Sequence, residues 1–440
     1  MSRHAAVRIR TAAACLAFAA AGCATLPDTE FLTERYTAQA ARVHGMRERE
    51  AALQQEIGGT SLVPGNRVTL LQDGPETYRA MLDAIGAARD HVNLESYIFE
   101  DGEVGQRFAD LLIERQAHGV QVNIIYDSVG AFGTSAAFFE RLRQAGIQVL
   151  EFNPVNPLAG EKAWTPNNRD HRKLLIVDGR TAFLGGINIS SVYSSGSGMR
   201  KRDRAAGDVG GWRDTDVRIE GPVVADYQRL FMATWQKQGG AALMPRDYFP
   251  ALAQSGTETV RAIGSTPDDE YSLIYLTLIA AITSAEKRVQ IVNAYFVPDP
   301  QLVRALLDAA ARGVDVRIIL PANSDSGVAF HAGRAHFSEL LEGGVRIYER
   351  QGALLHAKSA SVDGNWSCVG SSNLDWRSAL DNDEVNAVVL GPAFAARMET
   401  AFALDIAASE EIDLASWQRR ALVLHVKEWV AQAWARLLQV

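Results

Sequence analysis

At 440 residues the chain is too long for one ordinary domain, and its composition, 47% hydrophobic and 22% charged, is that of a globular protein with a large core. A formal net charge of −8 argues against nucleic acid as the main partner, because proteins that bind nucleic acid usually present a basic surface. The same balance is compatible with a local basic site.

Residues 1–22 have the pattern of an export signal. Three arginines precede an apolar run at 11–21, which is too short to cross a bilayer and has the length of a signal-peptide core. The run ends in Ala20-Ala21-Gly22-Cys23, which is similar to a bacterial lipoprotein cleavage box. We therefore expect Cys23 to carry a lipid, with plain secretion as the alternative. Because Ala24 rather than Asp follows, we expect a cell-envelope location at the periplasmic face of the outer membrane.

The cysteine content agrees with an exported chain. Cys15 leaves with the signal and Cys23 is acylated, so Cys368 is the remaining thiol and an internal disulfide cannot form. Cys368 lies in an apolar run typical of a strand, and we expect a buried structural thiol there.

Residues 23–60, rich in Ala, Arg, Glu and Gln, suggest a helical or flexible tether. Two halves with the same order of strands and helices follow, at 61–245 and 256–405, and Gly- and Ser-containing residues around 240–258 mark a linker. Alternating strands and helices favour a largely parallel sheet covered on both faces. The predicted fold class is therefore α/β, with two pseudo-symmetric α/β/α sandwich domains that share one active site.

Two further segments leave alternatives open. The Gly- and Ser-rich stretch at 191–211 contains a basic cluster, and it is either a solvated loop or a contact for an anionic substrate. Residues 413–440 predict one amphipathic helix, which either packs on the protein or lies at a lipid interface. Its apolar arc consists of Leu422, Val423, Val426, Val430, Trp434 and Leu437. Its polar strip consists of His425, Glu428, Gln432, Arg436 and Gln439.

The pattern His-x-Lys-x4-Asp occurs once in each half, and its six defining residues are the candidate catalytic set. Lysine accounts for only seven of the 44 Lys and Arg residues, so two chance matches are very improbable. In both halves a Gly follows the His at +14 and an Asn at +17. The residues are His171, Lys173 and Asp178 with Gly185 and Asn188, and His356, Lys358 and Asp363 with Gly370 and Asn373.

The spacing has a structural interpretation. Residues two apart on a strand point to the same side, so the His and Lys of each motif face one side together, and the Asp, seven positions after the His, faces away. Asp178-Gly179 and Asp363-Gly364 are also typical hairpin-turn dipeptides. We therefore interpret both Asp residues as turn and scaffold residues. The small residues that follow each hairpin let backbone amides approach an anion, and Asn188 and Asn373 can donate to the same oxygens.

These motifs resemble those of the phospholipase D superfamily and, within it, of bacterial cardiolipin synthases. The resemblance spans about residues 62–405 and includes the strings at 95–99, 212–222 and 382–386. Asp216 departs from the pattern, because many cardiolipin synthases have His at this place. The short N-terminal signal also replaces the paired membrane helices of many members.

The resemblance implies that a phosphatidyl group is transferred in two steps. One imidazole attacks phosphorus and forms a covalent phosphohistidine, while the other protonates the departing oxygen and later deprotonates the incoming alcohol or water. By resemblance His171 is the nucleophile and His356 the acid, although the pseudo-symmetry permits either order.

The other site residues follow from the same resemblance. Lys173 and Lys358, with Asn188 and Asn373, would offset charge on the phosphoryl oxygens, so no metal or other cofactor is expected. Asp214 and Glu384 resemble the carboxylates that orient the two imidazoles in this family.

The leading hypothesis is a phosphatidyltransferase that makes cardiolipin and glycerol from phosphatidylglycerol. A hydrolytic phospholipase D would use the same residues with water as the acceptor, so the motif does not separate the two. An exported nuclease of the superfamily is disfavoured by the acidic balance and the anchor, and a non-enzymatic binding protein by the intact motifs. We expect a phospholipid substrate at a membrane surface and no nucleic acid, and the oligomeric state stays open.

Overall fold

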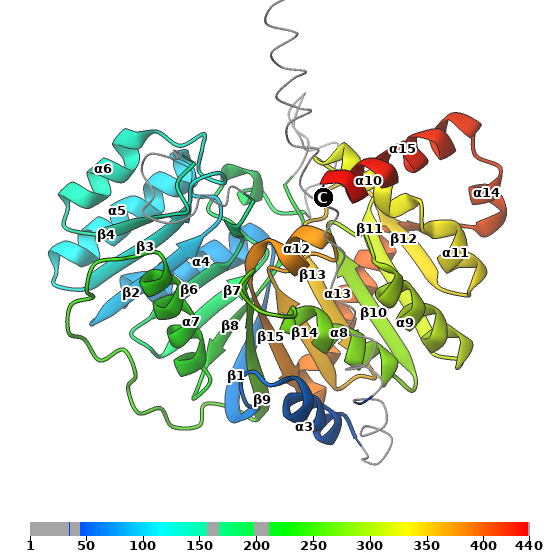
Figure 1. Cartoon of the computed structure of the whole chain (residues 1–440). Coiled ribbons are helices and arrows are strands. Elements are labelled where there is room, and N and C mark those ends of the chain that lie inside the picture. The colour runs from blue at the N-terminus through cyan, green and yellow to red at the C-terminus, as the bar shows by residue number, and fades with distance from the viewer. Residues whose placement is uncertain (1–34, 36–44, 156–166, 198–210, 439–440) are drawn as a thin grey trace, which may run out of the picture.

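The computed structural model describes residues 35, 45–155, 167–197 and 211–438 (Figure 1). The expected signal at 1–22, the lipidation site Cys23 and the basic cluster of the 191–211 stretch lie outside the described residues.

Among its described residues, the first half contains seven strands of the main sheet, a short additional strand and four helices. The strands are β1 (Val63–Gln72), β2 (His91–Ser96), β3 (Gln121–Asp127), β4 (Gln148–Phe152), β5 (Arg169–Asp170), β6 (Lys173–Val177), β7 (Thr181–Gly185) and β8 (Thr215–Glu220). The helices are α4 (Asp73–Gly86), α5 (Glu103–Ala117), α6 (Ala136–Gln144) and α7 (Val224–Lys237), with the short 3-10 helix η2 (Ser191–Tyr193).

The second half repeats this plan. Its strands are β9 (Glu258–Ser265), β10 (Arg288–Asn293), β11 (Asp315–Pro321), β12 (Arg346–Arg350), β13 (Lys358–Val362), β14 (Trp366–Gly370), β15 (Asn382–Leu390) and β16 (Ser409–Glu411). Its helices are α8 (Leu273–Thr283), α9 (Pro300–Ala311), α10 (Gly327–Arg334), α11 (Phe337–Glu342), α12 (Trp376–Leu380) and α13 (Pro392–Ala407).

The repeat is visible in the strand order. The first half runs β4-β3-β2-β6-β7-β8-β1 and the second β12-β11-β10-β13-β14-β15-β9, and β1 pairs with β9, so the described strands form one sheet. Strands β7 and β8 also contact β14 and β15 across the seam between the halves. The α/β architecture of two pseudo-symmetric halves that the sequence predicts is therefore present.

The expectation of a largely parallel sheet is wrong. Parallel pairing is limited to β2-β3-β4, β10-β11-β12 and the short β5–β15 pair, and the other pairs are antiparallel. The reason is local, because the hairpins β6–β7 and β13–β14 reverse the chain within three residues, with no helix between their strands.

Asp178 and Asp363 form the turns of these two hairpins. Both have positive φ, 54° and 53°, and each is followed by a Gly with positive φ, a backbone conformation that suits a tight hairpin turn. The Asp178 carboxylate accepts from the backbone N–H groups of residues 89–91, and that of Asp363 from those of residues 286–288. Both carboxylates thus tie the turn to the start of a neighbouring strand, as their interpretation as scaffold residues requires.

Every residue of β2 and β3 is buried, because helices cover both faces of the sheet. One cluster lies under α4, α5 and α6, a second under α8, α9 and α11, and a third between the strands of the two halves. Cys368 lies in the second cluster and is buried, as predicted, and burial raises the pKa of its thiol to about 12.

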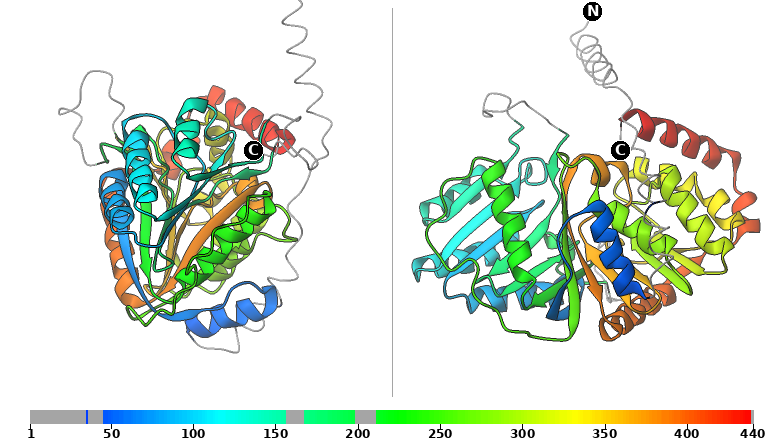
Figure 2. Two further views of the ribbon diagram at one scale, coloured as in Figure 1. Left: turned by 90° about the vertical axis from the view of Figure 1, so that its left-hand side faces the viewer. Right: turned by 60° about the horizontal axis from the view of Figure 1, so that its bottom comes forward.

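Part of the predicted tether is a packed helix, α3 (Met46–Ile57), at the edge of the molecule far from α15 (Figure 2). Its Glu50 is only 3% exposed and accepts hydrogen bonds from Arg261 and from the indole of Trp366. The buried ion pair with Arg261 fixes this helix to the second half.

The tail differs from the expected single helix. It forms α14 (Leu414–Gln418), capped by Asp413, and then α15 (Leu422–Leu438), which packs on α10. Glu428 of the polar strip is buried against Arg420, whereas Val423 and Val426 of the apolar arc are exposed. The side chains of Leu422, Trp434 and Leu437 lie outside the described residues.

Candidate active site

Both motif histidines stand just before the first strand of a hairpin, at the same edge of the sheet. Lys173, the first residue of β6, pairs with Ser96 at the carboxyl end of β2, and Lys358, the first residue of β13, pairs with Asn293 at the carboxyl end of β10. The carboxyl ends of the parallel strands in both halves therefore meet the motifs, which is where ligands bind in α/β sheets.

Backbone hydrogen bonds across the seam hold the two motifs in one site. The N–H of His171 donates to the carbonyl of Asp383 at 2.9 Å, and the N–H of His356 donates to the carbonyl of Arg213 at 2.8 Å. Each histidine is thus joined to the residue immediately before the carboxylate that the opposite half supplies.

Each imidazole is bonded to a carboxylate from the other half. His171 Nδ1 lies 3.0 and 3.1 Å from the two oxygens of Glu384, and His356 Nδ1 lies 2.7 Å from Asp214 Oδ2. Both carboxylates are inaccessible to solvent, and the histidine side chains are 11% and 6% exposed. Each motif histidine therefore takes its carboxylate partner from the opposite half.

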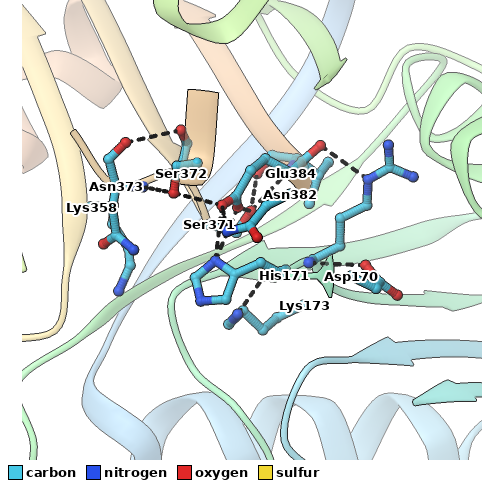
Figure 3. A network of polar contacts seen from close by, with 12 residues as sticks. Asp170, His171, Lys173, Lys358, Ser371, Ser372, Asn373, Asn382 and Glu384 are labelled. Carbon is cyan, nitrogen blue, oxygen red and sulfur yellow. Dashed lines mark hydrogen bonds and ion pairs between the residues drawn. The ribbon is translucent and has the colours of Figure 1, made fainter. Parts of the chain in front are cut away.

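Hydroxyl and amide groups fix the Glu384 carboxylate in turn (Figure 3). Ser371 donates to Oε2, Ser378 donates to Oε1 at 2.8 Å, and Asn382 donates to Oε1 at 3.3 Å. Asp214 has a different set of partners, because its Oδ1 accepts from the N–H of Thr215 at 2.7 Å. Both carboxylates are therefore held before any substrate binds.

Burial and neighbouring charges set the protonation of the two pairs. Burial, opposed by Glu384, lowers the pKa of His171 to about 4, and burial together with the Lys358 ammonium lowers the pKa of His356 to about 4. Burial would raise the carboxylate pKa values, but the facing His and Lys groups outweigh it, so the pKa values of Asp214 and Glu384 lie below normal. A neutral imidazole that donates Nδ1–H to an ionised carboxylate keeps its Nε2 lone pair available.

The two lysines are buried beside the histidines. Each lysine donates to the main-chain carbonyl of its own motif histidine, and Lys358 Nζ also lies 3.0 Å from both ring nitrogens of His356. Burial lowers the pKa of Lys173 to about 7 and that of Lys358 to about 8. Buried ammonium groups of this kind favour an anionic ligand, such as a phosphodiester.

The two asparagines lie in the same region but in different surroundings. Asn188 Oδ1 accepts from the N–H of Ile98 at 3.0 Å, and its Nδ2 lies 3.4 Å from the Tyr193 hydroxyl. Asn373 Oδ1 is buried and has no hydrogen-bond partner among the described residues. Binding of phosphoryl oxygens by these side chains stays a prediction.

Asp216, the departure from the family pattern, is buried on β8, two residues after Asp214. It pairs with Gly185, and its Oδ1 accepts from the N–H of Ile187 at 3.1 Å. Burial and the nearby Asp214 raise its pKa well above the usual value. Asn386 holds the equivalent position opposite Gly370 in the second half, so Asp216 occupies a structural position of the repeat.

Sequence reasoning missed two hydroxyl groups. The Tyr193 hydroxyl lies 3.1 Å from His356 Nδ1, and Ser378 donates to Glu384. Both residues follow their own motif histidine by 22 positions, at 193 − 171 and at 378 − 356, so the internal repeat was the signal that could have found them. Ser371, noted only as a small residue, is also a donor to Glu384.

A repeated α/β fold with two His-x-Lys motifs that converge on one seam defines a phospholipase D-like protein. Residues 81–195 and 278–406 match the family model described as cardiolipin synthase, PLD-like domain. The chain is 34% identical over 389 residues to a cardiolipin synthase of Geobacillus thermodenitrificans (strain NG80-2), over 88% of this chain and 75% of that protein. It is 33% identical over 398 residues to cardiolipin synthase 2 of Bacillus anthracis, over 90% and 75%.

Among solved structures, the phosphatidylserine synthase of Haemophilus influenzae Rd KW20 is similar, with a TM-score of 0.65 and 13% identity, over 90% of this chain and 100% of that chain. At this identity the likeness shows the fold alone. The family model and the two relatives at 33–34% identity show the family as well as the fold. The chain belongs to the cardiolipin synthase family of phospholipase D-type phosphatidyltransferases.

Among the described residues, no helix has the length and apolar character needed to cross a membrane. Within the same part of the chain, no group of three or more His, Cys, Asp or Glu side chains is arranged to hold a metal ion.

Proposed function

We propose that the protein joins two molecules of phosphatidylglycerol into cardiolipin and releases glycerol, through a covalent phosphohistidine. The observation that carries the proposal is the crossed pairing of His171 with Glu384 and of His356 with Asp214. It supports two oriented imidazoles at one site, one as nucleophile and one as acid and base.

In the first step Nε2 of His171 attacks phosphorus, and the bond from phosphorus to the glycerol headgroup oxygen breaks. That oxygen takes a proton from His356, and glycerol leaves. In the second step a headgroup hydroxyl of another phosphatidylglycerol gives its proton to His356 and attacks phosphorus, and the phosphorus–nitrogen bond breaks. The anionic phosphodiester raises the pKa of the imidazoles that face it, which lets His356 carry the proton that it donates.

The surroundings of the two rings support this division of roles. Lys358 Nζ lies beside both ring nitrogens of His356, so the protonated ring is acidic and gives up its proton readily. Both lysines donate to the main-chain carbonyl of their own motif histidine, and the ring of His171 is held by both oxygens of Glu384. Both ammonium groups offset charge that develops on the phosphoryl oxygens.

Lipid analysis tests the proposal. Purified protein is incubated with phosphatidylglycerol in detergent micelles, and the products are identified by mass spectrometry; the account expects cardiolipin and glycerol in equal amounts. Phosphatidic acid without cardiolipin would show hydrolysis, in which water replaces the acceptor alcohol. A plasmid-nicking assay tests the alternative that the protein is a nuclease, and we expect no cleavage of the plasmid.

The location in the envelope is part of the proposal. The signal pattern at 1–22 and the box ending at Cys23 support lipid attachment and placement at the periplasmic face of the outer membrane. Labelling of cells with a radioactive fatty acid checks this, because a Cys23→Ser variant is expected to lose the label while the unchanged chain keeps it. Equal labelling of both chains would contradict it.

A further inference from the structure

Exposed apolar side chains gather at one edge of the molecule. The described residues leave eleven large apolar side chains exposed, and eight of them come from segments at the edge where the motifs lie. The eight are Val129, Phe132, Val155 and Val192 in the first half, and Val423, Val426, Trp429 and Val430 in the second. We call this set the apolar rim.

In the first half the topology places the rim beside the active site. Phe132 follows the carboxyl end of β3, and Val155 follows that of β4, the two strands that run parallel to β2. The carboxyl end of β2 pairs with Lys173, so these loops emerge at the motif edge. Phe132 is 85% exposed, the largest value among these side chains.

In the second half the rim lies on α15. Helix α10 follows the carboxyl end of β11, which runs parallel to β10, and α15 packs on α10. Figure 1 shows α15 and α10 at the same edge as α12, with α3 at the opposite edge. Trp429 in this helix is 70% exposed.

The exposed residues form one face of α15. At 100° per residue, Val423, Val426, Trp429 and Val430 lie within an arc of about 120°. The buried Glu428 lies on the other side, where it is paired with Arg420. A helix that presents several valines and a tryptophan outwards on one face is suited to lie in a lipid interface.

We propose that the apolar rim docks the protein on the surface of a phospholipid bilayer, with the two imidazoles facing the headgroups. The inference rests on the phospholipid substrate of the proposed function and adds the surface by which the enzyme reaches it. A bilayer fits better than a second protein, because the rim comes from both halves and flanks the site between them. A protein partner that covered both parts would close the substrate's path to His171 and His356.

Vesicle binding tests the proposal on the full chain carrying Cys23→Ser, so that acylation cannot hold it on the membrane. One variant combines Val423→Ser, Val426→Ser and Trp429→Ser, and another carries Phe132→Ser. In co-sedimentation with phosphatidylglycerol–phosphatidylcholine vesicles, the triple variant is expected to bind about tenfold more weakly and Phe132→Ser about threefold. Turnover of phosphatidylglycerol on vesicles falls in parallel, while turnover in detergent micelles stays within about twofold of the parent.

Met244→Ser is the matched control. Met244 is 50% exposed, but it lies near the opposite edge, where its carbonyl accepts from Tyr248, whose ring packs on His91 at the start of β2. This variant is expected to bind vesicles as the parent does. Equal vesicle binding by the parent and the triple variant would overturn the proposal.

Sedimentation equilibrium measures self-association and so distinguishes a bilayer from a second copy of the chain as the partner of the rim. A triple variant that loses self-association while keeping its vesicle binding would assign the surface to a second copy and overturn the proposal. A parent protein that makes no cardiolipin in micelles, but binds vesicles through the rim, would reject the proposed function and leave the docking surface standing.

Discussion

The carboxylate that reaches across the seam is Asp214 in the first half and Glu384, one methylene longer, in the second. The residue 22 positions after each motif histidine changes in the opposite sense, from the large Tyr193 to the small Ser378. Tyr193 lies against the His356–Asp214 pair, and Ser378 against the His171–Glu384 pair. The two halves thus share the same backbone plan. Around each imidazole, the shorter carboxylate is accompanied by the larger neighbouring side chain and the longer carboxylate by the smaller one.

The position 15 residues after each histidine differs as well. A Cβ at Gly186 would lie 2.2 Å from Asp214 Oδ1, whereas the equivalent Ser371 uses its hydroxyl to bond Glu384. The two imidazoles therefore share one plan but have different donors around their carboxylates. Such differences allow one ring to serve as nucleophile and the other as acid.

The largest effect is expected from the histidines themselves. His171→Ala and His356→Ala should each lower kcat by about 1,000-fold or more, because each step needs both rings. The double variant should be little worse than either single one. His118→Ala, at the end of α5, serves as the control and should keep full activity; a single variant within tenfold of the parent would contradict the two-histidine mechanism.

The crossed carboxylates come next. Asp214→Asn and Glu384→Gln keep the shape but lose the charge that orients the ring, and each should lower kcat by about 100-fold. Glu384→Asp keeps the charge but shortens the reach to His171, and should lower kcat by about tenfold. Rates are measured in micelles, with thermal melts to confirm folding. Unchanged rates in both charge variants would remove the carboxylates from the mechanism.

The pH dependence follows from the buried lysines. Their ammonium charge is present below their pKa and is lost as the pH rises through about 7 for Lys173 and about 8 for Lys358. If both charges hold the phosphodiester, kcat/KM should fall by about tenfold per pH unit between pH 7 and 8, where one ammonium is lost, and by about 100-fold per unit above 8, where both are lost. An activity that still rises between pH 8 and 9 would contradict this role.

Smaller effects should distinguish the two hydroxyl groups. Tyr193→Phe removes a hydrogen bond to His356, and Ser378→Ala removes one to Glu384, so each should lower kcat by about fivefold. KM should stay unchanged, because neither group is expected to contact the substrate. A change in KM alone would assign these positioning residues to substrate binding.

The turn residues should affect stability more than chemistry. Asp178→Ala and Asp363→Ala each leave three backbone N–H groups without their acceptor, which should cost about 2–4 kcal/mol of unfolding free energy. Chemical denaturation measures this loss. Wild-type stability together with a specific loss of kcat would return both residues to the catalytic chemistry.

Local patterns predicted much of this structure. The repeat and the periods of apolar residues indicated the two halves, and the Asp-Gly dipeptides indicated the two hairpins. The mixed sheet was missed because alternation of strands and helices was extended to the hairpin strands, whose turns demand antiparallel pairing. The crossed pairs required a resemblance, since 213 residues separate His171 from Glu384 and no local pattern connects them.

The face of α15 that packs on the protein could not be read from the helix periodicity. An apolar arc usually faces the protein. Here the buried Glu428 forms an ion pair with Arg420, which lies eight residues earlier and outside the helix. Because Arg420 lies outside the helix, the periodicity of the helix sequence does not reveal this ion pair.

The most direct test of the two-step mechanism is a single-turnover reaction with phosphatidylglycerol labelled at phosphorus, stopped in denaturant under alkaline conditions that preserve phosphohistidine. The account predicts labelled protein with the parent chain, with the label on the peptide that contains His171, and no label with His171→Ala. Label on His356 would reverse the roles, and turnover to cardiolipin without labelled protein at any time would contradict the covalent mechanism.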